Sequence, residues 1–388
     1  MTPGSSNVSN PPAKVLITGA TGFIGSRLCE ILSLTKFAVP RAFVHSTATA
    51  ARITRFPLDF FVGDLCDRKS VQRAMEGCDA VVHLARGDKR VMRVGLENVL
   101  RAAADQGVSR FVHMSSVAVY GNHPPPESTS EAAPAKRTDM EYGNEKLRQE
   151  ERVLKYGRRR GLPIVILRPP NVSGPFSGFS LDLMNRIRGG RLAIVEAGQN
   201  PCNLVYVDNL VEAVLLALCK PEATGEIFFI TDSGALSWER CLNDHAALLG
   251  RSLPRVSATE LVDKPAERYI RDSLRAVPRV LLAGELRGLL REIPAIRSIE
   301  SVFYAGFQSL SGESQQKIRH IVQGPLVFEK NGTLDRSMYF RDNIHQAQCR
   351  KVAHSSEKAR RLLGYSALVS YREGMELTEA WLRYCRFL

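Results

Sequence analysis

The most constraining feature of this sequence is the stretch KVLITGATGFIGSRLCEILSL, residues 14–34. An apolar run with strand character leads into three glycines spaced three residues apart, and a helical pattern of apolar residues follows at once. Glycine lets the backbone turn tightly between a strand and a helix. The ordered chain is therefore expected to begin with a β-strand that passes directly into an α-helix.

Apolar runs of strand length recur through the first half of the chain, and helical patterns separate most of them. The expected strands are residues 14–18, 42–45, 58–62, 80–85, 110–116 and 163–168. Strands that alternate with helices are typical of right-handed crossovers, which place the strands in one parallel sheet and cover both of its faces. We therefore predict an α/β fold, a Rossmann-like doubly wound parallel sheet, which binds ligands beyond the carboxyl ends of its strands.

Gly19, Gly22 and Gly25 also indicate a ligand. At the start of a helix the backbone N–H groups are unpaired and attract an anion, and glycine lets the chain come close to a pyrophosphate. The position of these glycines between a strand and a helix is the context that a dinucleotide-binding loop requires. The alternative is a tight turn that needs glycine for packing alone.

The end of the second expected strand bears on which dinucleotide binds. A carboxylate there would hydrogen-bond the ribose hydroxyls of NAD, whereas a cation would favour the 2′-phosphate of NADP. The strand ends at His45 and Ser46 with no acidic residue, and Arg41 and Arg52 lie near it in the sequence. The cofactor is therefore NAD or NADP, with tolerance of NADP expected. Asp64, after the third strand, either meets the adenine or caps the strand end.

The patterns also divide the chain. Residues 1–13 have the composition of a disordered tail, and residues 14–169 are expected to form the dinucleotide-binding domain. Residues 203–232 read as a strand, a helix and a further strand that return to this domain. The rest of 170–388 is expected to form a smaller, mainly helical substrate-binding part, with a helical insertion at about 253–322.

Residues 264–291 carry more basic than acidic residues, with apolar residues at helical spacing. A basic amphipathic helix of this kind lies on an acidic membrane surface, covers a lipid-like substrate, or packs on its own domain, and these alternatives stay open. Peripheral membrane contact is thus one alternative, although no apolar run is long enough to span a bilayer. A hairpin over 326–340 and two amphipathic helices within 355–365 and 371–385 are expected to follow.

Composition narrows the class of protein. With 44% apolar and 24% charged residues, the chain has the makeup of a globular protein with a sizeable core. Its eight cysteines show no pair or His/Cys cluster at metal-ligand spacing, which predicts reduced thiols, no metal site and a cytoplasmic location. The net charge of +13 is dispersed without a nucleic-acid motif, so we expect an anionic small-molecule partner and no nucleic acid.

Tyr142 and Lys146 lie four residues apart in the stretch EYGNEK. A helix places residues at this spacing one turn apart on the same face. A close ammonium favours the ionised form of a phenol. Because a pair of this kind also arises by chance, its meaning depends on the motifs around it.

Seven motifs supply that context: TGATGFIG, GDL, HLA, SSVAVYG, YGNEK, LRPPNVSGP and VYVDNLVEA. Their order and spacing resemble those of the extended short-chain dehydrogenases/reductases, and most closely the NAD-dependent epimerase/dehydratase family. The resemblance runs from Lys14 to Asp232 and recurs at SSEKARRLLGY near the end of the sequence.

The resemblance implies roles for three residues. Tyr142 would be the general acid/base, and Lys146 would be its electrostatic partner and bind the nicotinamide ribose. Ser116 would hydrogen-bond the substrate oxygen. Lowering the pKa of a phenol from about 10 to about 7 requires roughly 4 kcal/mol, which a close ammonium and a positive nicotinamide ring supply in a partly desolvated cleft.

The resemblance also extends both sites. Besides the residues already named, the cofactor site would include Phe23, Ile24, Leu65, Leu84, Ala85 and Arg168. The substrate site would include Ser116, Tyr120, Asn171 and Asn203. Packing is the alternative for Tyr120, and shaping of the backbone is the alternative for Arg168 and Asn171.

Several positions depart from the family pattern. Met92 stands where the family often has asparagine, although Asn98 is kept; Asn209 replaces the second acid of a paired motif, although Asp208 is kept. The stretch with which many members hold a nucleotide-sugar is not recognisable, and FRDN at 340–343 occupies its approximate place.

We therefore expect an NAD(P)-dependent oxidoreductase of the epimerase/dehydratase type that acts on a secondary alcohol or carbonyl, preferably of a nucleotide-sugar. The alternative substrate is a hydroxysteroid or another apolar alcohol, which the unrecognisable nucleotide stretch favours. A non-catalytic dinucleotide-binding protein is the alternative of another class. A homodimer is a further expectation.

Overall fold

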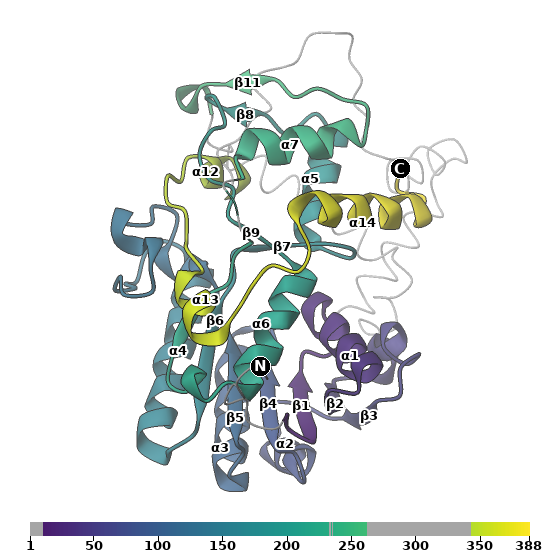
Figure 1. Cartoon of the computed structure of the whole chain (residues 1–388), viewed down its shortest axis with the longest axis vertical. Coiled ribbons are helices and arrows are strands. Elements are labelled where there is room, and N and C mark those ends of the chain that lie inside the picture. The colour runs from purple at the N-terminus through teal and green to yellow at the C-terminus, as the bar shows by residue number, and fades with distance from the viewer. Residues whose placement is uncertain (1–10, 233, 235, 262–342) are drawn as a thin grey trace, which may run out of the picture.

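A seven-stranded, fully parallel sheet forms the centre of the molecule (Figure 1). The computed structural model describes residues 11–232, 234, 236–261 and 343–388. In spatial order the strands are β10 (Ile227–Phe229), β6 (Ile164–Arg168), β5 (Arg110–Met114), β4 (Ala80–His83), β1 (Lys14–Thr18), β2 (Val39–Val44) and β3 (Asp59–Val62). The predicted Rossmann-like doubly wound α/β fold is confirmed.

Helices cover both faces of this sheet. One face packs on α1 (Phe23–Thr35), α6 (Val207–Cys219) and α13 (Glu357–Leu363), and the other on α2 (Arg68–Met75), α3 (Leu96–Gln106) and α4 (Glu141–Arg160). Successive residues of a strand point to opposite faces, so Val15 and Ile17 lie in the first core while Leu16 lies in the second. Strands buried on both faces explain the continuous apolar runs of the sequence.

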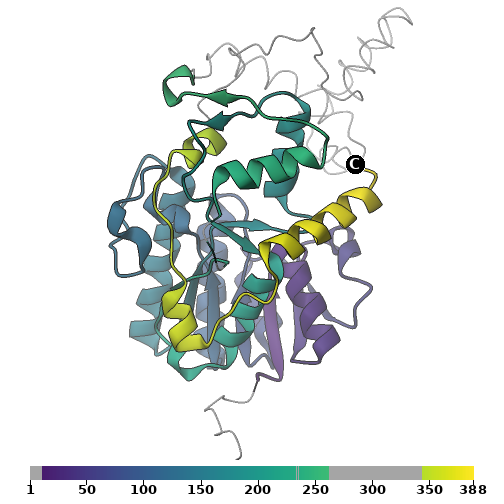
Figure 2. The same cartoon turned by 45° about the horizontal axis from the view of Figure 1, so that its top comes forward.

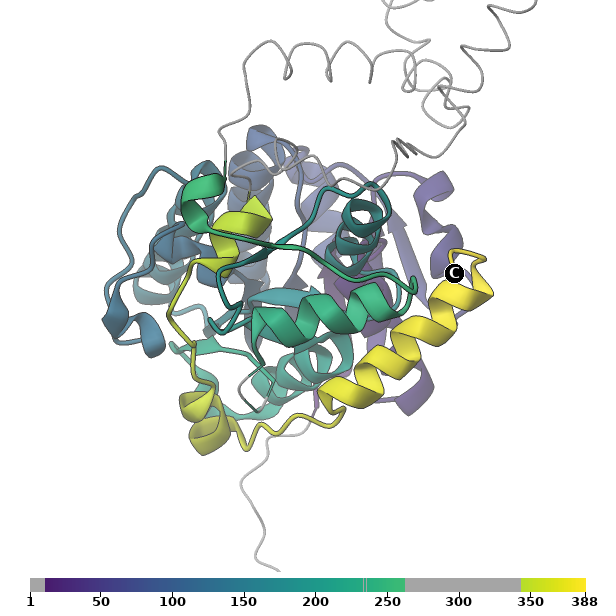
Figure 3. The same cartoon turned by 90° about the horizontal axis from the view of Figure 1, so that it is seen from above.

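A smaller part lies beyond the carboxyl ends of the strands (Figures 1 and 2). Its helices are α5 (Gly178–Arg188), α7 (Trp238–Ala247), α12 (Asn343–Gln348) and α14 (Tyr371–Tyr384). Two short parallel pairs join them, β7 (Asn171–Ser173) with β9 (Leu204–Tyr206), and β8 (Ile194–Val195) with β11 (Arg255–Val256). Fully buried Trp238 anchors α7 in a core shared with α5, and Figure 3 shows α7 and α14 lying across this side of the sheet.

Short helical turns connect the main elements. The 3-10 turns are η1 (Thr47–Arg52), η3 (Val117–Tyr120), η4 (Pro126–Thr129), η5 (Pro221–Ala223) and η6 (Ala258–Glu260), and η2 (Val91–Gly95) is a π-helical turn. The two closing helices are present, and α13 ends at Gly364, which adopts a left-handed φ of +73°.

Some boundaries differ from those expected from sequence. β2 begins at Val39 because Val39–Arg41 pair with Lys14–Leu16, whereas the expected strand began at residue 42. The expected strand over 110–116 ends at Met114, since Ser116 caps the following turn. The hairpin over 326–340, the basic helix over 264–291 and most of the insertion at about 253–322 lie outside the described residues. None of the helices formed by the described residues has the length and apolar character needed to cross a bilayer.

Candidate active site

Two strand ends meet at the middle of the carboxyl edge. The chain proceeds from β1 to β2 and β3 on one side, and through β4, β5 and β6 on the other, so the switch point lies between β1 and β4. Gly19, at the end of β1, has a φ of +71°, and a Cβ there would lie 2.9 Å from the backbone nitrogen of Ala85 and from the carbonyl carbon of Leu84. Glycine is therefore required for the two strand ends to approach each other.

The start of α1 lies beside this contact and has no side-chain cap. Gly22 is the N-cap residue, and the first turn of the helix contains no acidic residue. A Cβ on Gly25 would overlap the carbonyl oxygen of Gly19, so the loop folds tightly on itself. Phe23 and Ile24 form the first helical positions, and Ile24 packs against the core. The unpaired N–H groups of the first helical turn, together with glycines that leave room for a ligand, fit a pyrophosphate.

The ends of β2 and β3 carry the two polar residues expected near the adenosine. His45 and Asp64 are exposed, and the Asp64 carboxylate accepts a hydrogen bond from the backbone N–H of Cys66 at 2.8 Å. Asp64 thus caps the turn after β3. Neighbouring Leu65 is half-buried, and its carbonyl accepts a hydrogen bond from the Asn98 side chain at 2.9 Å.

Both arginines near the end of β2 have protein partners. The guanidinium of Arg41 bonds the carboxylate of Asp59 at 2.8 Å and also donates to two carbonyls at the end of α2. The guanidinium of Arg52 lies 4.3 Å from the ring centre of Phe176. Neither arginine is therefore evidence for the 2′-phosphate of NADP, and both NAD and NADP remain candidate cofactors.

Ser116, Tyr142 and Lys146 come together on the β5 side of this edge. Ser116 follows β5, and its hydroxyl accepts a hydrogen bond from the backbone N–H of Ala118 at 3.1 Å. The hydroxyl lies close enough to Tyr142, in the first turn of α4, to lower the pKa of the phenol. Lys146 lies one turn further, and its ammonium donates to the carbonyl of Met114 at 2.8 Å. α4 can approach the turn after Ser116 because residue 143 is glycine.

Burial sets the protonation of this group. Burial, with a smaller contribution from positively charged Arg86, lowers the pKa of Lys146 to about 8. Burial raises the pKa of Tyr142, while Arg86 and the nearby hydroxyl of Ser116 oppose the increase. Behind Lys146, His83 and His113 stack at 5.6 Å between ring centres, and burial depresses both pKa values so that the rings stay neutral.

Arg86 is the residue of this site that the sequence reasoning missed. It follows Ala85 beyond the end of β4, its side chain is exposed, and its guanidinium carbon lies 4.9 Å from the ring centre of Tyr142. The signal that was available is the basic stretch RGDKR directly after the HLA motif. Without the fold, nothing connected that stretch with Tyr142.

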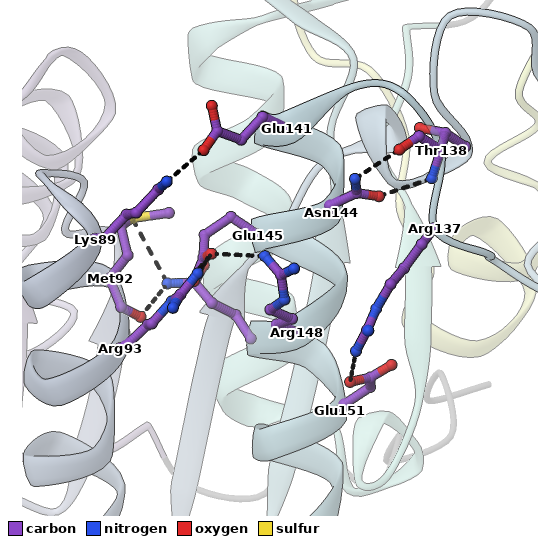
Figure 4. A network of polar contacts seen from close by, with 11 residues as sticks. Lys89, Met92, Arg93, Arg137, Thr138, Glu141, Asn144, Glu145, Arg148 and Glu151 are labelled. Carbon is purple, nitrogen blue, oxygen red and sulfur yellow. Dashed lines mark hydrogen bonds and ion pairs between the residues drawn. The ribbon is translucent and has the colours of Figure 1, made fainter.

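The segment after Arg86 runs along α4 and is bonded to it at several points (Figure 4). The ammonium of Lys89 pairs with Glu141 at 2.6 Å, and the guanidinium of Arg93 pairs with Glu145 at 2.7 Å. The side chain of Gln149 donates to the carbonyl of Met92 at 2.8 Å. Glu141, Glu145 and Gln149 lie at successive turns, so these bonds hold the helix that carries Tyr142.

Two of the expected site residues are buried and bonded to one another. The guanidinium of Arg168 forms a bidentate pair with Glu150, at 2.8 and 2.6 Å, and donates to the hydroxyl of Tyr120 at 2.9 Å. The Tyr120 hydroxyl donates to the carbonyl of Ala133 at 3.0 Å, and only 2% of Tyr120 and 4% of Arg168 is exposed. The geometry favours the packing alternative for Tyr120 and the shaping alternative for Arg168.

The remaining expected substrate residues lie on the short strands above the sheet. Half-buried Asn171 begins β7, and Asn203 precedes β9. The Asn203 side chain donates to the carbonyl of Val352 at 2.9 Å and accepts from the N–H of His354 at 2.9 Å. Asn203 thus ties the C-terminal segment to the sheet.

Asp208 and Asn209, noted in the sequence as kept and altered, both have structural partners. Asp208 forms a bidentate pair with Arg27 of α1, at 2.6 and 2.7 Å. Asn209 is fully buried, bonds both backbone polar groups of Val369 and donates to Asp232 at 2.7 Å. Both residues fix α6 in place.

Comparison with known proteins identifies the family of this chain. A model of the NAD-dependent epimerase/dehydratase family matches residues 15–230. The chain is 27% identical over 262 residues to the UDP-glucose 4-epimerase of Vibrio cholerae, a match that covers 62% of this chain and 77% of that enzyme. It is 29% identical over 299 residues to the 2-alkyl-3-oxoalkanoate reductase of Stenotrophomonas maltophilia, with 70% and 86% covered.

A solved structure supports the same fold. The UDP-glucose 4-epimerase of Thermotoga maritima superposes with a TM-score of 0.65 at 19% identity, over 96% of this chain and 99% of that enzyme. The family match spans the glycine-rich turn over residues 19–25, here called the phosphate loop, and it also spans Ser116, Tyr142 and Lys146. The chain therefore belongs to the NAD-dependent epimerase/dehydratase family, whose members are nicotinamide-dependent enzymes.

Proposed function

We propose that this enzyme interconverts a secondary alcohol and a carbonyl with Ser116, Tyr142 and Lys146 as its catalytic residues. The observation that carries the proposal is their meeting at the carboxyl edge, with the phosphate loop at the neighbouring strand ends. In this assignment residues 14–169 with 203–232 bind the cofactor, and the rest of 170–388 covers the substrate.

Each residue has a task that follows from its surroundings. The Tyr142 hydroxyl gives a proton to the substrate oxygen in reduction and takes it back in oxidation, while the Ser116 hydroxyl hydrogen-bonds the same oxygen. Lys146, with a pKa of about 8, is mostly protonated at neutral pH. In this proposal its charge helps to stabilise the ionised phenol once the cofactor is bound. When bound, the nicotinamide cofactor supplies or accepts the hydride.

The protein alone does not prepare Tyr142 for proton removal. Burial raises the pKa of the phenol, so it stays protonated at neutral pH. The positive charge of an oxidised nicotinamide ring, added to those of Lys146 and Arg86, would lower this pKa toward neutrality. Proton transfer is thereby tied to the presence of the cofactor.

A nucleotide-sugar is the preferred substrate. The similarity to a UDP-glucose 4-epimerase supports it, and in such a reaction the hydride returns to the sugar. An apolar hydroxy or oxo compound, such as a hydroxysteroid or an alkyl oxoalkanoate, is the second candidate. The similarity to a 2-alkyl-3-oxoalkanoate reductase and the unrecognisable nucleotide stretch at 340–343 favour it. A protein that only binds dinucleotides would not need Ser116 and Lys146 grouped around Tyr142.

The variant Tyr142→Phe tests the catalytic assignment. Removing one hydroxyl should reduce turnover by about 10²- to 10⁴-fold while NADH affinity stays within about twofold. Turnover is followed with UDP-glucose and with 3-hydroxyhexadecanoate as probes. Tyr156→Phe is the matched control, because Tyr156 lies on the same helix and bonds Glu97 away from the site. Turnover unchanged in Tyr142→Phe would refute the assignment.

A further inference from the structure

Arg86 brings an exposed positive charge onto the face of the catalytic phenol. Its guanidinium carbon lies 4.9 Å from the ring centre of Tyr142, and its backbone follows Ala85, which contacts the phosphate loop at Gly19. A cation on an aromatic ring is common at protein surfaces and needs no function. The position of this one, on the residue that handles the substrate proton, gives its charge access to the substrate.

The backbone that carries Arg86 is fixed. A Cβ on Gly87 would lie 2.9 Å from the Cβ of Val91, so the chain turns closely there. The Asp88 carboxylate accepts a hydrogen bond from the N–H of Val91, the first residue of the π-helical turn η2, at 2.9 Å. Lys89 then joins the segment to α4 through its ion pair with Glu141. A backbone fixed in this way can hold the side chain of Arg86 in a defined position for binding a ligand.

The charges around Arg86 leave it available for an anion. The acidic residues of α4 that face this region are already paired: Glu141 with Lys89, Glu145 with Arg93, and Glu150 with Arg168. Within the described part of the chain, Arg86 has no ion pair. Its positive charge instead contributes to lowering the pKa of Lys146, a second cation, so the site carries an excess of positive charge.

We propose that Arg86 binds a carboxylate of the substrate, on the carbon next to the carbon that bears the reacting oxygen. This inference rests on the function proposed above, because Tyr142 fixes where the reacting oxygen lies. The guanidinium of Arg86 lies on the ring of Tyr142, so a substrate that hydrogen-bonds to both residues must carry its carboxylate close to its reacting oxygen. The planar guanidinium pairs with a carboxylate through two parallel hydrogen bonds.

This placement of a carboxylate is common to two classes of molecule. A 3-hydroxy acid carries it on the carbon next to the carbinol, and so does the uronic acid of a nucleotide-sugar when the 4-hydroxyl reacts. For both candidate classes, Arg86 therefore implies a substrate with a carboxylate at this position. It selects acids over their neutral counterparts.

The test uses two matched pairs of probes that differ in this charge: UDP-glucuronate with UDP-glucose, and 3-hydroxyhexadecanoate with its primary amide. Binding to the NADH-loaded enzyme is measured by titration calorimetry for the wild type and for Arg86→Ala. In at least one pair, the wild type should bind the acid about tenfold or more tightly than the neutral compound. Arg86→Ala should abolish this preference and leave affinity for the neutral compound within about twofold.

Arg90→Ala is the matched control, since it removes an exposed arginine from the same segment; it should keep the preference for the acid. Equal affinity of the wild type for acid and neutral compound in both pairs would overturn the inference. Equal weakening of UDP-glucuronate and UDP-glucose in Arg86→Ala would also overturn it, because the diphosphate would then be the ligand of Arg86.

The inference and the proposed function can fail separately. If Tyr142→Phe abolishes turnover while no Arg86-dependent preference exists, the carboxylate site is wrong and the catalytic assignment stands. If Tyr142→Phe keeps turnover while Arg86→Ala loses the preference in binding, the catalytic assignment is wrong and Arg86 is shown to bind the carboxylate.

Discussion

Gly143 lies directly against the backbone of Ala118. A Cβ on residue 143 would overlap the carbonyl oxygen of Ala118, which belongs to the turn that follows Ser116. The approach of Tyr142 to Ser116 therefore depends on the residue after the tyrosine having no side chain. The glycine in EYGNEK sets the distance between the catalytic helix and the end of β5.

Gly143→Ala tests this dependence. In the interior of a helix this change normally stabilises a protein by up to about 1 kcal/mol. Here α4 must move, so we expect a loss of about 1–3 kcal/mol in the free energy of unfolding and about a hundredfold loss of kcat. The measurements are urea unfolding and steady-state turnover. Gly178→Ala is the control, since nothing lies within 4 Å of a Cβ at residue 178. Equal effects of the two variants would contradict the expectation.

Lys146 should make stability depend on pH in a particular window. Burial lowers its pKa from 10.5 to about 8. Between these values the unfolded chain binds more protons than the folded protein, so this residue's contribution to the free energy of unfolding rises with pH from about 8 to 10.5. Below pH 8 it is destabilising by about 3 kcal/mol.

The comparison variant for this window is Lys146→Met. It loses the bond to the carbonyl of Met114 but should exceed the wild type in unfolding free energy by roughly 2 kcal/mol at pH 7, while turnover is lost. Urea unfolding of both proteins at pH 7, 8, 9 and 10 should show the difference closing as pH rises. A difference that stays constant with pH would show that the ammonium is not destabilised by burial.

Replacing only one residue of the buried ion pair between Arg168 and Glu150 should lower the free energy of unfolding. Arg168→Met leaves the Glu150 carboxylate buried without its main partner, which should reduce the free energy of unfolding by about 3–5 kcal/mol. Changing both residues, with Glu150→Leu, should recover part of that loss because no unpaired charge remains. Arg372→Ala, in a well-exposed pair with Glu376, serves as the control and should leave Tm unchanged. A double variant less stable than Arg168→Met would contradict this account.

A substitution at His45 tests whether this residue affects selectivity between NAD and NADP. His45→Asp places a carboxylate at the end of β2, where it should repel the 2′-phosphate and weaken NADP binding about tenfold or more. Affinity for NAD should stay similar or rise. His45→Asn is the neutral control and should keep both affinities within about twofold. Fluorescence titration with NADH and NADPH gives the ratio, and an unchanged ratio in His45→Asp would show that residue 45 does not face the ribose.

Much of this arrangement could be predicted from the sequence because it depends on local patterns. Apolar runs gave the parallel sheet, and the glycine spacing gave the turn from β1 into α1. Ser116, Tyr142 and Lys146 were predicted because the motifs SSVAVYG and YGNEK resemble those of the family, and each motif is a short local stretch of sequence. Signals of this kind need no knowledge of distant contacts.

The parts that were missed depend on pairs that are far apart in the sequence. Arg86 meets Tyr142 only because a π-helical turn, η2, lays the segment after β4 along α4. The sequence suggested that Arg168 binds the cofactor, but its guanidinium forms a buried ion pair with Glu150 of α4. The early start of β2 follows from pairing with β1. Periodicity within one element contains none of this information.

The place of α13 has a consequence for synthesis of the protein. Ala359 and Leu363 are fully buried in the core on one face of the central sheet, although they follow the sheet's last strand by more than a hundred residues. That core is therefore completed only when the closing helices have left the ribosome. A chain stalled before α13 should therefore show less protection of the β6 and β10 amides from hydrogen exchange than the released protein.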